Sequence, residues 1–385
     1  MTTRPAIISL LIVSLFAVAL CGTSTLHVPD DYPTIQSAVD AATDGDIVLI
    51  APGVYYENIF ISRVSITLAS RYLQTQDESD ILNTVIDGQG ETVIDIRTVD
   101  PTTTITGLTI QNGNDGISTH SKIQLLHNRV IGNKDGIDYE GGGGLCRWNL
   151  FENNSDDGID LDGACDVTIE DCLILNNDDD GIEIRLHSYN GEMLDIIIRR
   201  NLIQGNGEDG IQFIDYATNS HRAFRIERNV IANNDMAALG CMGDMNTVEN
   251  YEAFAIPERI LLINNTMVDN AYGVTGGGNM IILNNIIADT AEAAMKGVGG
   301  NSIAAYNLFW RNGVDAHEAI WLEQTCLFAD PLLSIEHQPL PGSPCTDAGI
   351  SFFEHNDEIL LNYVVDDFSG ESPDLGALEQ ASSSN

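Results

Sequence analysis

Two short stretches of the chain carry an unusual density of carboxylates. Residues 154–163 read NSDDGIDLDG and residues 177–187 read NDDDGIEIRLH, which together hold eight acidic side chains and one arginine. Two carboxylates about 5 Å apart repel each other by about 3.5 kcal/mol at an effective dielectric constant near 20. Such a pattern therefore needs cations, backbone N–H donors or raised pKa values to compensate it.

Hard carboxylate oxygens in this number are the ligands that Ca²⁺ prefers, since it takes six to eight oxygens. No pair of histidines stands beside the patch at the spacing of a zinc site, so zinc is disfavoured. The predicted calcium ligands are Asp138, Asp157, Asp160, Asp162, Asp180 and Glu183. Two structural alternatives stay open. The Asp before each Gly can serve the turn itself, and the remaining acids can form a solvated face.

A repeat in the sequence determines where these carboxylates can stand. Asparagines five residues apart recur along the chain as Asn128/Asn133, Asn149/Asn154, Asn201/Asn206, Asn229/Asn234, Asn265/Asn270 and Asn307/Asn312. Cys172/Asn177 and Asn285/Thr290 fill the two places between them, so that successive steps are 20 to 36 residues long. A period in the low twenties with occasional insertions is typical of a solenoid.

Apolar residues alternate before each Asn, and Asp-Gly-Ile follows it, as short strands with a bend require. The pattern predicts an all-β fold, a single-stranded right-handed parallel β-helix whose rungs lie about 4.8 Å apart. In this register Ile159, Ile182 and Ile211 stack inside, and the Asn side chains form a structural ladder. The outward columns run Asp138, Asp160, Glu183 and Glu140, Asp162, Arg185.

The domain organisation follows from this repeat. Residues 1–24 are predicted to be a signal peptide, and 25–385 one parallel β-helix domain with no linker or break in composition. Within it, 25–60 form an N-terminal cap with a short helix and the first turn. Regular coils are expected over about 105–315, and a closing segment over about 325–380.

The first residues favour export of the protein. A basic start at Arg4 precedes an apolar run over 6–20, which is too short to span a bilayer comfortably. We expect a secreted, periplasmic or cell-surface protein without a membrane span, with a lipoprotein anchor at Cys21 as the alternative. In an oxidising compartment Cys326 and Cys345 could pair, whereas Cys146 and Cys172 are placed by the repeat at inward core positions.

The charge of the chain restricts its partners. Seventeen basic residues face 57 acidic ones, for a net charge of −40. Nucleic acid and anionic membrane surfaces are poor partners for such a field. A polyanionic substrate would be repelled too, unless cations bridge it to the protein. Adaptation to a saline habitat is an alternative explanation of the acidity, and we expect a monomer.

The two ends of the chain carry a resemblance to a known family. The stretch HVPDDYPTIQSAVDAATDGDIVLIAPGVYYENI at 27–59, in which Thr34 caps a helix over 35–42, resembles the start of many pectin-lyase-like proteins. Residues 347–349 and 374–379 resemble their closing segment. The resemblance implies a secreted right-handed parallel β-helix that acts on or binds a polysaccharide. This superfamily holds lyases, hydrolases, esterases, epimerases and proteins without catalysis.

The resemblance and the acidic patch together favour a calcium-dependent polysaccharide lyase or epimerase that acts on an acidic, uronate-containing polymer. Such chemistry needs a cation to acidify the proton next to the sugar carboxylate and a base to remove it. By resemblance Arg185 is the candidate base, although it could simply neutralise the acids around it. Long loops follow these rungs and predict the wall of a groove, with Tyr251 as a stacking residue and these substrate-binding candidates: Lys134, His187, Tyr189, Tyr216, His221 and Arg222.

Two other functions remain open. Residues 154–160 and the pair Asp179-Asp180 loosely resemble motifs of polygalacturonases, which would give catalytic roles to Asp157, Asp179 and Asp180 in a glycoside hydrolase. The next rung reads Glu-Asp-Gly-Ile where that family has Gly-His-Gly, which speaks against this function. The alternative from a different class is a non-catalytic glycan-binding or structural surface protein.

Overall fold

The structure is a computed structural model of the chain. It describes residues 22–98, 102–216, 220–243, 245, 247–251 and 256–380. The predicted signal sequence up to Cys21 therefore lies outside the described residues. No helix within these ranges is long and apolar enough to cross a membrane.

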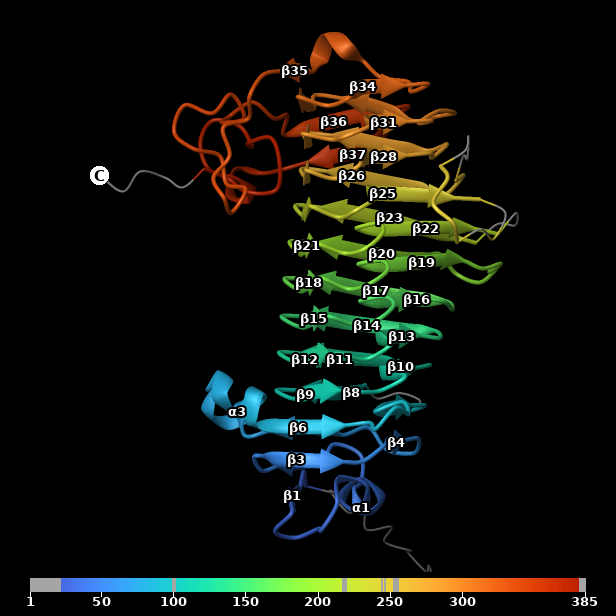
Figure 1. The fold of residues 1–385 in the computed structure, drawn as a ribbon, viewed down its shortest axis with the longest axis vertical. Coiled ribbons are helices and arrows are strands. Elements are labelled where there is room, and N and C mark those ends of the chain that lie inside the picture. Colours follow the sequence, from blue (N-terminus) through green and yellow to red (C-terminus); the bar gives the residue numbers. More distant parts are fainter. Residues whose placement is uncertain are drawn as a thin grey trace, which may run out of the picture.

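The chain winds into a solenoid whose walls are three long parallel sheets (Figure 1). We call them sheets A, B and C. Sheet A contains β1 (Thr25–Val28), β2 (Ile47–Ile50), β5 (Thr67–Ser70), β8 (Thr103–Thr106), β11 (Lys122–Leu126), β14 (Gly142–Arg147), β17 (Cys165–Glu170), β20 (Leu194–Arg199), β23 (Arg222–Glu227), β26 (Arg259–Ile263), β29 (Met280–Leu283) and β32 (Ile303–Ala305).

Sheets B and C complete each turn. Sheet B contains β3 (Gly53–Tyr56), β6 (Thr84–Asp87), β9 (Thr109–Gln111), β12 (Arg129–Ile131), β15 (Leu150–Glu152), β18 (Leu173–Leu175), β21 (Leu202–Gln204), β24 (Val230–Ala232), β27 (Thr266–Val268), β30 (Ile286–Ala288), β33 (Leu308–Trp310) and β35 (Leu327–Phe328). Sheet C contains β4 (Ile59–Ile61), β7 (Ile94–Ile96), β10 (Asp115–Thr119), β13 (Asp135–Tyr139), β16 (Ile159–Leu161), β19 (Ile182–Leu186), β22 (Ile211–Asp215), β25 (Ala237–Met242), β28 (Tyr272–Thr275), β31 (Ala293–Lys296) and β34 (Val314–His317).

The predicted parallel β-helix and its register are confirmed. Ile159 pairs with Ile182, Ile182 pairs with Ile211, and all three side chains are fully buried. Because side chains alternate along a strand, burial of these isoleucines directs the residue after each of them outward. Consequently Asp160 pairs with Glu183 in the outer column of sheet C.

The asparagine ladder is also as predicted. The Oδ1 atom of Asn229 accepts hydrogen bonds from the backbone N–H of Asn201, at 3.0 Å, and from its Nδ2, at 2.9 Å. The same two bonds join Asn149 to Asn128. Each amide therefore satisfies a buried backbone donor of the preceding rung, which would otherwise cost about 1–3 kcal/mol. Cys172 interrupts this stack, and its N–H donates to Asn201 instead.

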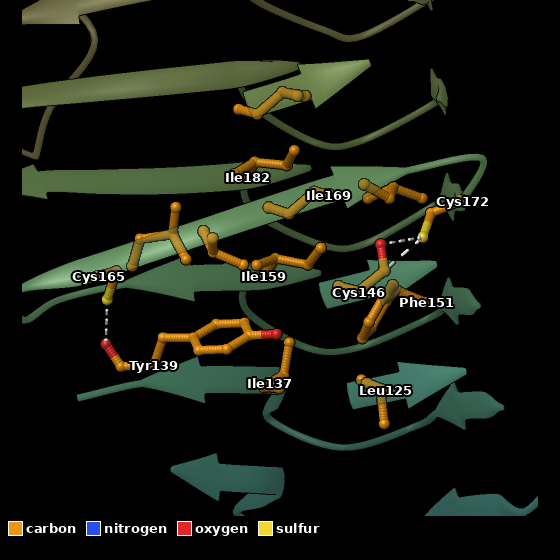
Figure 2. Close-up of a cluster of buried hydrophobic side chains, with 14 of the residues drawn as sticks. Leu125, Ile137, Tyr139, Cys146, Phe151, Ile159, Cys165, Ile169, Cys172 and Ile182 are labelled. Carbon is orange, nitrogen blue, oxygen red and sulfur yellow. Dashed lines mark hydrogen bonds between the residues drawn. The ribbon is translucent and has the colours of Figure 1, made fainter. Parts of the chain in front are cut away.

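Apolar and aromatic side chains fill the interior of the solenoid (Figure 2). Cys146 and Cys172 lie in this core as predicted, with their sulfurs 3.9 Å apart. Tyr139 spans the same region and is fully buried, and its carbonyl accepts a hydrogen bond from the Cys165 thiol. A solenoid of parallel strands would leave core side chains and strand edges uncovered, and the elements outside the three sheets cover them.

Three helices lie outside the walls. Helix α1 (Ile35–Ala41) buries Ile35 in the core and is capped by Thr34, as the sequence predicts, and Ser37 completes a capping box. Helices α2 (Tyr72–Thr75) and α3 (Glu78–Asn83) were not predicted. They form an excursion beside sheet B, where Ile81 O accepts a hydrogen bond from Thr109 Oγ1 at 2.8 Å.

The C-terminal segment differs from a simple closing cap. It includes η1 (Glu323–Thr325), the hairpin β36 (Phe352–His355) and β37 (Glu358–Asn362), and η2 (Val365–Asp367). Its later part packs sideways on sheet B, where Leu375 and Cys345 contact the cluster around Ile286. The predicted pairing of Cys326 with Cys345 is wrong, because both are free thiols. Cys326 packs on the core at the end of the solenoid, whereas Cys345 lies in that separate flank cluster.

Candidate active site

The aspartates that precede each glycine form an inner ladder. Asp157 Oδ1 accepts from the N–H of Asp180 at 3.0 Å, and Asp180 Oδ1 accepts from the N–H of Asp209 at 2.7 Å. Asp209 Oδ1 in turn accepts from the N–H of Ala237. All three carboxyls are buried, and desolvation, the largest cause, raises the pKa of Asp157 and Asp180 well above the ordinary value. The sequence offered a turn role for this column, but each of these three acids accepts from the backbone of the next rung rather than from its own following backbone.

The outer column has different surroundings. Asp138 pairs with Asp160 and Asp160 with Glu183 on neighbouring strands of sheet C. The Oδ1 atoms of Asp138 and Asp160 are buried and have no hydrogen-bond partner among the described residues. Burial first, and the neighbouring carboxylates second, raise the pKa of Asp138 to about 7 and that of Asp160 to about 9. Burial likewise raises the pKa of Glu183 to about 7, although Arg185 opposes this shift.

These residues fit a cation. Two groups have carboxylate oxygens that all lie within 4.8 Å of one another, and they share Asp160: the first is Asp138, Asp160 and Asp162, and the second is Asp157, Asp160 and Glu183. All donors are hard oxygens, which suits Ca²⁺, and two buried oxygens lack any other partner. Five of the six predicted ligands therefore come together. The sixth, Asp180, lies in the inner ladder and belongs to neither group.

Arg185 occupies the middle of the outer acids. Its Nη1 lies 3.0 Å from Asp162 Oδ1 and 3.4 Å from Asp160 Oδ2, and its Nη2 lies 2.5 Å from Glu183 Oε1. Burial works against the charged form, but the three carboxylates outweigh it and raise the pKa of Arg185 above its ordinary value. The guanidinium is therefore held as a cation. This arrangement fits the neutralising role that the sequence left open better than the role of a base.

Several of the predicted substrate-binding residues meet beside this centre. Asp162, His187, Tyr189 and Arg222 line one cleft of about 360 Å³. His187 Nε2 lies 3.7 Å from Asp162 Oδ1, and the imidazole packs against the ring of Tyr216 with centroids 4.1 Å apart. An imidazole and two tyrosines therefore stand next to the carboxylates that could hold a cation. The roles of these side chains toward a substrate remain predictions.

Arg222 and His221 hold the loops around the cleft. The Arg222 guanidinium donates to the carbonyl oxygens of His187, Ser220 and Gly163 at 2.8 to 2.9 Å, and the residue is only 4% exposed. His221 Nδ1 lies 2.9 Å from the carbonyl oxygen of Gly191. Arg222 thus holds three backbone carbonyls in place around the cleft, and little of its surface is left for a ligand.

Comparisons with known proteins agree with this architecture. The family described as the right-handed β-helix region matches residues 92–255. The A-module of mannuronan C-5 epimerase AlgE6 from Azotobacter vinelandii is 17% identical, with a TM-score of 0.57 over 77% of this chain and 94% of that one. The chain has the right-handed parallel β-helix fold.

Other solved structures are less similar. Pectate lyase Pel9A is 15% identical, with a TM-score of 0.48 over 90% of each chain. The PL6 family polysaccharide lyase Pedsa3628 from Pseudopedobacter saltans is 12% identical, with a TM-score of 0.48 over 82% of this chain and 94% of that one. No curated protein matches the sequence.

The β-helix carries a second cluster of acidic side chains that the sequence did not predict. Asp179, a predicted catalytic residue, meets Asp156 and Glu208, and Glu208 meets Glu249 of the next loop. Burial and then these neighbours raise the pKa of Glu208 to about 9. Lys134 also lies here, 2.6 Å from Asp156 Oδ2, which is away from the cleft that holds His187. Part of this group could have been predicted from the sequence, because residues 156, 179 and 208 each directly precede an aspartate of the inner ladder. Glu249 could not, because it comes from a loop.

Tyr251 does not provide the exposed stacking face that was predicted for it. The residue is 4% exposed and packs in a small cluster with Ile214 and Met242. Its hydroxyl donates to Asp209 Oδ1 of the inner ladder. The prediction was wrong because the loop that carries Tyr251 folds back onto sheet C, and loop length alone does not reveal this direction.

Proposed function

We propose that this protein is a calcium-dependent polysaccharide lyase or epimerase that acts outside the cell on an acidic, uronate-containing polymer. The observation that carries the proposal is the outer column of sheet C. There Asp138 and Asp160 each keep a buried oxygen that no described residue contacts by a hydrogen bond, inside groups of carboxylates close enough to share one ion. The AlgE6 module, which shares the fold, is by its name an enzyme of such a polymer.

A cation at this position would do two things for the substrate. Bound Ca²⁺ would offset the repulsion between a sugar carboxylate and a chain of net charge −40, and would make the proton beside that carboxylate more acidic. The residues that would hold it are those of one group or the other: Asp138, Asp160 and Asp162, or Asp157, Asp160 and Glu183. The polymer would lie across sheet C, in the cleft that Tyr189 and His187 line.

His187 is the better proton acceptor. A base needs a lone pair that can take up a proton; a ring nitrogen of a neutral imidazole offers one, and a guanidinium offers none. His187 lies 3.7 Å from Asp162 at the edge of the outer acids. Arg185 would have to release a proton that three carboxylates hold in place. We therefore assign Arg185 the role of balancing the charge of the acids and His187 the role of the base. The ring of Tyr216 packs against His187.

The buried state of the inner ladder weighs against a glycoside hydrolase. Such an enzyme needs two carboxyl groups that face the scissile bond. Asp157 and Asp180 are 4% and 1% exposed, and each spends an oxygen on a backbone N–H of the next rung. Of the three residues proposed for that role, only Asp179 is partly exposed.

The test is to incubate residues 25–385 with polygalacturonate, polymannuronate and polyguluronate, with Ca²⁺ or with a chelator. Ultraviolet absorbance reports the unsaturated ends that a lyase makes. Incorporation of solvent deuterium beside the sugar carboxylate reports an epimerase. We expect one of these signals, only with Ca²⁺. New reducing ends without unsaturation would indicate the hydrolase, and binding without any chemistry would indicate a glycan-binding protein.

Two variants separate the candidate bases. His187→Asn should lower the rate at least a hundredfold, the lower part of the range for a positioned proton-transfer group. Arg185→Ala should leave most of the rate in place when Ca²⁺ is saturating. The reverse result, with Arg185→Ala inactive and His187→Asn active, would return the base to Arg185. The calcium-induced rise in melting temperature checks that both variants keep the metal site.

A further inference from the structure

A preformed cleft lies far from sheet C, at the corner where sheet A meets sheet B. Its volume is about 570 Å³. One wall is helix α3, which projects from the side of the solenoid (Figure 1) and contributes Ile81 and Leu82. The floor is the outer face of sheet B, where Leu150 and Leu173 stand on neighbouring strands. A concave, mostly apolar site with a few polar groups is the usual form of a small-ligand pocket.

The second wall is a stack of rings. The centroids of Tyr72 and His127 lie 5.0 Å apart, and those of His127 and Trp148 lie 4.6 Å apart. Tyr72 Oη is 3.1 Å from His127 Nδ1, and the Arg147 guanidinium lies over the Trp148 ring at 4.8 Å. Trp148 still exposes 47% of its surface. The wall is therefore rigid and presents the edge of an indole to whatever enters the cleft.

Arg129 lines the cleft, and its guanidinium has no partner among the described residues. It is half-buried on strand β12, and no described residue forms a hydrogen bond or ion pair with its guanidinium. The chain holds 57 acidic residues, yet none of those described pairs with it. Asp171, which also lines the cleft, already receives two bonds from Arg200, at 2.7 and 2.8 Å. An unpaired, half-buried guanidinium suits a carboxylate, which it can bind through two parallel hydrogen bonds.

Arginines offset the acidic side chains at this corner. Glu170, which is 1% exposed, is contacted by three arginines: Arg147, Arg199 and Arg200. With Asp171 and Glu227 included, these six residues sum to zero charge, and Arg129 balances Glu78 at the rim of the cleft. On a chain whose net charge is −40, this corner is a place where an anion can bind directly, with no bridging cation.

We propose that the cleft is a second binding site, which holds one uronate residue of a polysaccharide chain. Arg129 binds the sugar carboxylate, the ring lies against Leu173 and the edge of Trp148, and Glu78 at the rim accepts a hydroxyl hydrogen bond. The choice of a uronate rests on the proposed function, and the site itself does not. This site would keep the polysaccharide bound to the protein while the site on sheet C acts on another part of the same polysaccharide.

The experiment measures binding to a protein in which the proposed calcium site on sheet C is disabled. Trigalacturonate, trimannuronate and triguluronate are titrated in a chelator into the Asp160→Asn, Glu183→Gln protein, with maltotriose as the neutral probe. Calorimetry and tryptophan fluorescence report binding, and Trp148→Phe identifies which of the three tryptophans responds. We expect at least one acidic trisaccharide to bind and maltotriose to bind at least tenfold more weakly.

Variants of the cleft decide the outcome. Arg129→Gln and Leu173→Asp should each weaken binding at least tenfold. The matched controls are Arg63→Gln, an exposed arginine, and Leu340→Asp, whose side chain is 45% exposed against 44% for Leu173; neither lines the cleft, and both should leave binding unchanged. Absence of acidic-trisaccharide binding, equal binding of maltotriose, or insensitivity to Arg129→Gln would each overturn the proposal. Since no turnover is measured, an inactive sheet C would not affect this result.

Discussion

Asp180 and Glu183 stand three residues apart on one rung, and both are almost fully buried, yet their surroundings differ. The inner acid accepts a hydrogen bond from the N–H of Asp209, so its oxygen is part of the backbone scaffold. The outer acid faces Asp160 and relies on a single arginine for compensation. Carboxylates that receive backbone donors hold the fold together, whereas carboxylates without them store repulsion that a bound ion can release.

The difference between the inner and the outer acids should have its largest effect on how the free energy of unfolding depends on pH. The outer acids have folded-state pKa values of about 7 for Asp138, about 9 for Asp160 and about 7 for Glu183, all above the ordinary value near 4. The folded state therefore binds more protons than the unfolded state between about pH 4 and pH 9. In a chelator, the free energy of unfolding should fall across that window as pH rises, by at least about 3 kcal/mol.

Urea unfolding at several pH values measures this fall. Saturating Ca²⁺ should remove most of it, because the ion compensates the same charges. The double variant Asp160→Asn, Glu183→Gln should make the fall smaller, and Asp138, Asp157 and Asp180, whose pKa values are raised as well, should account for what remains. The control Asp166→Asn changes an exposed acid paired with Lys122 and should leave the slope as it is. A flat curve for the unmodified chain would mean that the outer acids are only a solvated face.

The next effect concerns activity. Asp160→Asn with Glu183→Gln removes members of both carboxylate groups that could hold an ion. We expect a loss of at least a hundredfold in kcat/KM, which corresponds to about 2.7 kcal/mol of transition-state stabilisation. The calcium-induced rise in melting temperature should disappear as well. Asp166→Asn should retain both properties, and a double variant with normal activity would contradict the metal assignment.

A smaller effect is expected in the inner ladder. Asp180→Ala leaves the N–H of Asp209 buried without an acceptor and should lower the free energy of unfolding by about 2 kcal/mol. Asp180→Asn keeps an oxygen acceptor and removes a buried charge, so it should be neutral or stabilising. Chemical denaturation of the two variants side by side is the measurement. Equal losses in both would show that the charge, and not the hydrogen bond, matters at this position.

The smallest effect is that of the arginine. Arg185→Ala removes the counter-charge of Asp160, Asp162 and Glu183 and should lower the stability of the calcium-free protein by about 1 kcal/mol, since the pairs are partly exposed. Ca²⁺ should restore most of this loss. A variant that is more stable than the parent in a chelator would mean that burying the guanidinium costs more than its ion pairs return.

Much of the site could be read from the sequence because the solenoid converts a linear period into spatial columns. The pairing of Asp160 with Glu183 and the burial of Ile182 both followed from counting residues from the glycine. Sequence could not give the hydrogen-bond partners of the acids. Asp157 and Asp160 are the same residue type, and only the position of the next rung's N–H makes one of them a scaffold group.

Residues on loops and excursions were the least predictable. Tyr251 was expected to face a substrate, but its loop folds back and buries it, whereas Arg222 begins strand β23 and lines the cleft although it is only 4% exposed. The excursion that carries α3 has no repeat, so nothing in its sequence indicates that it stands over Leu173 and Arg129. The path of such segments depends on contacts with distant residues, and those contacts have no period to reveal them.

The sequence by itself determined the β-helix, its register and the stacking of acids on one face, because regular alternation and repeated glycine bends allow a single way to bury the isoleucines. The tertiary structure decided which acids are satisfied, that Arg185 sits among three of them, and that a cleft with an unpaired Arg129 forms at the opposite corner. These features depend on distances between atoms of different rungs and loops. Such distances are fixed only when the whole solenoid has closed.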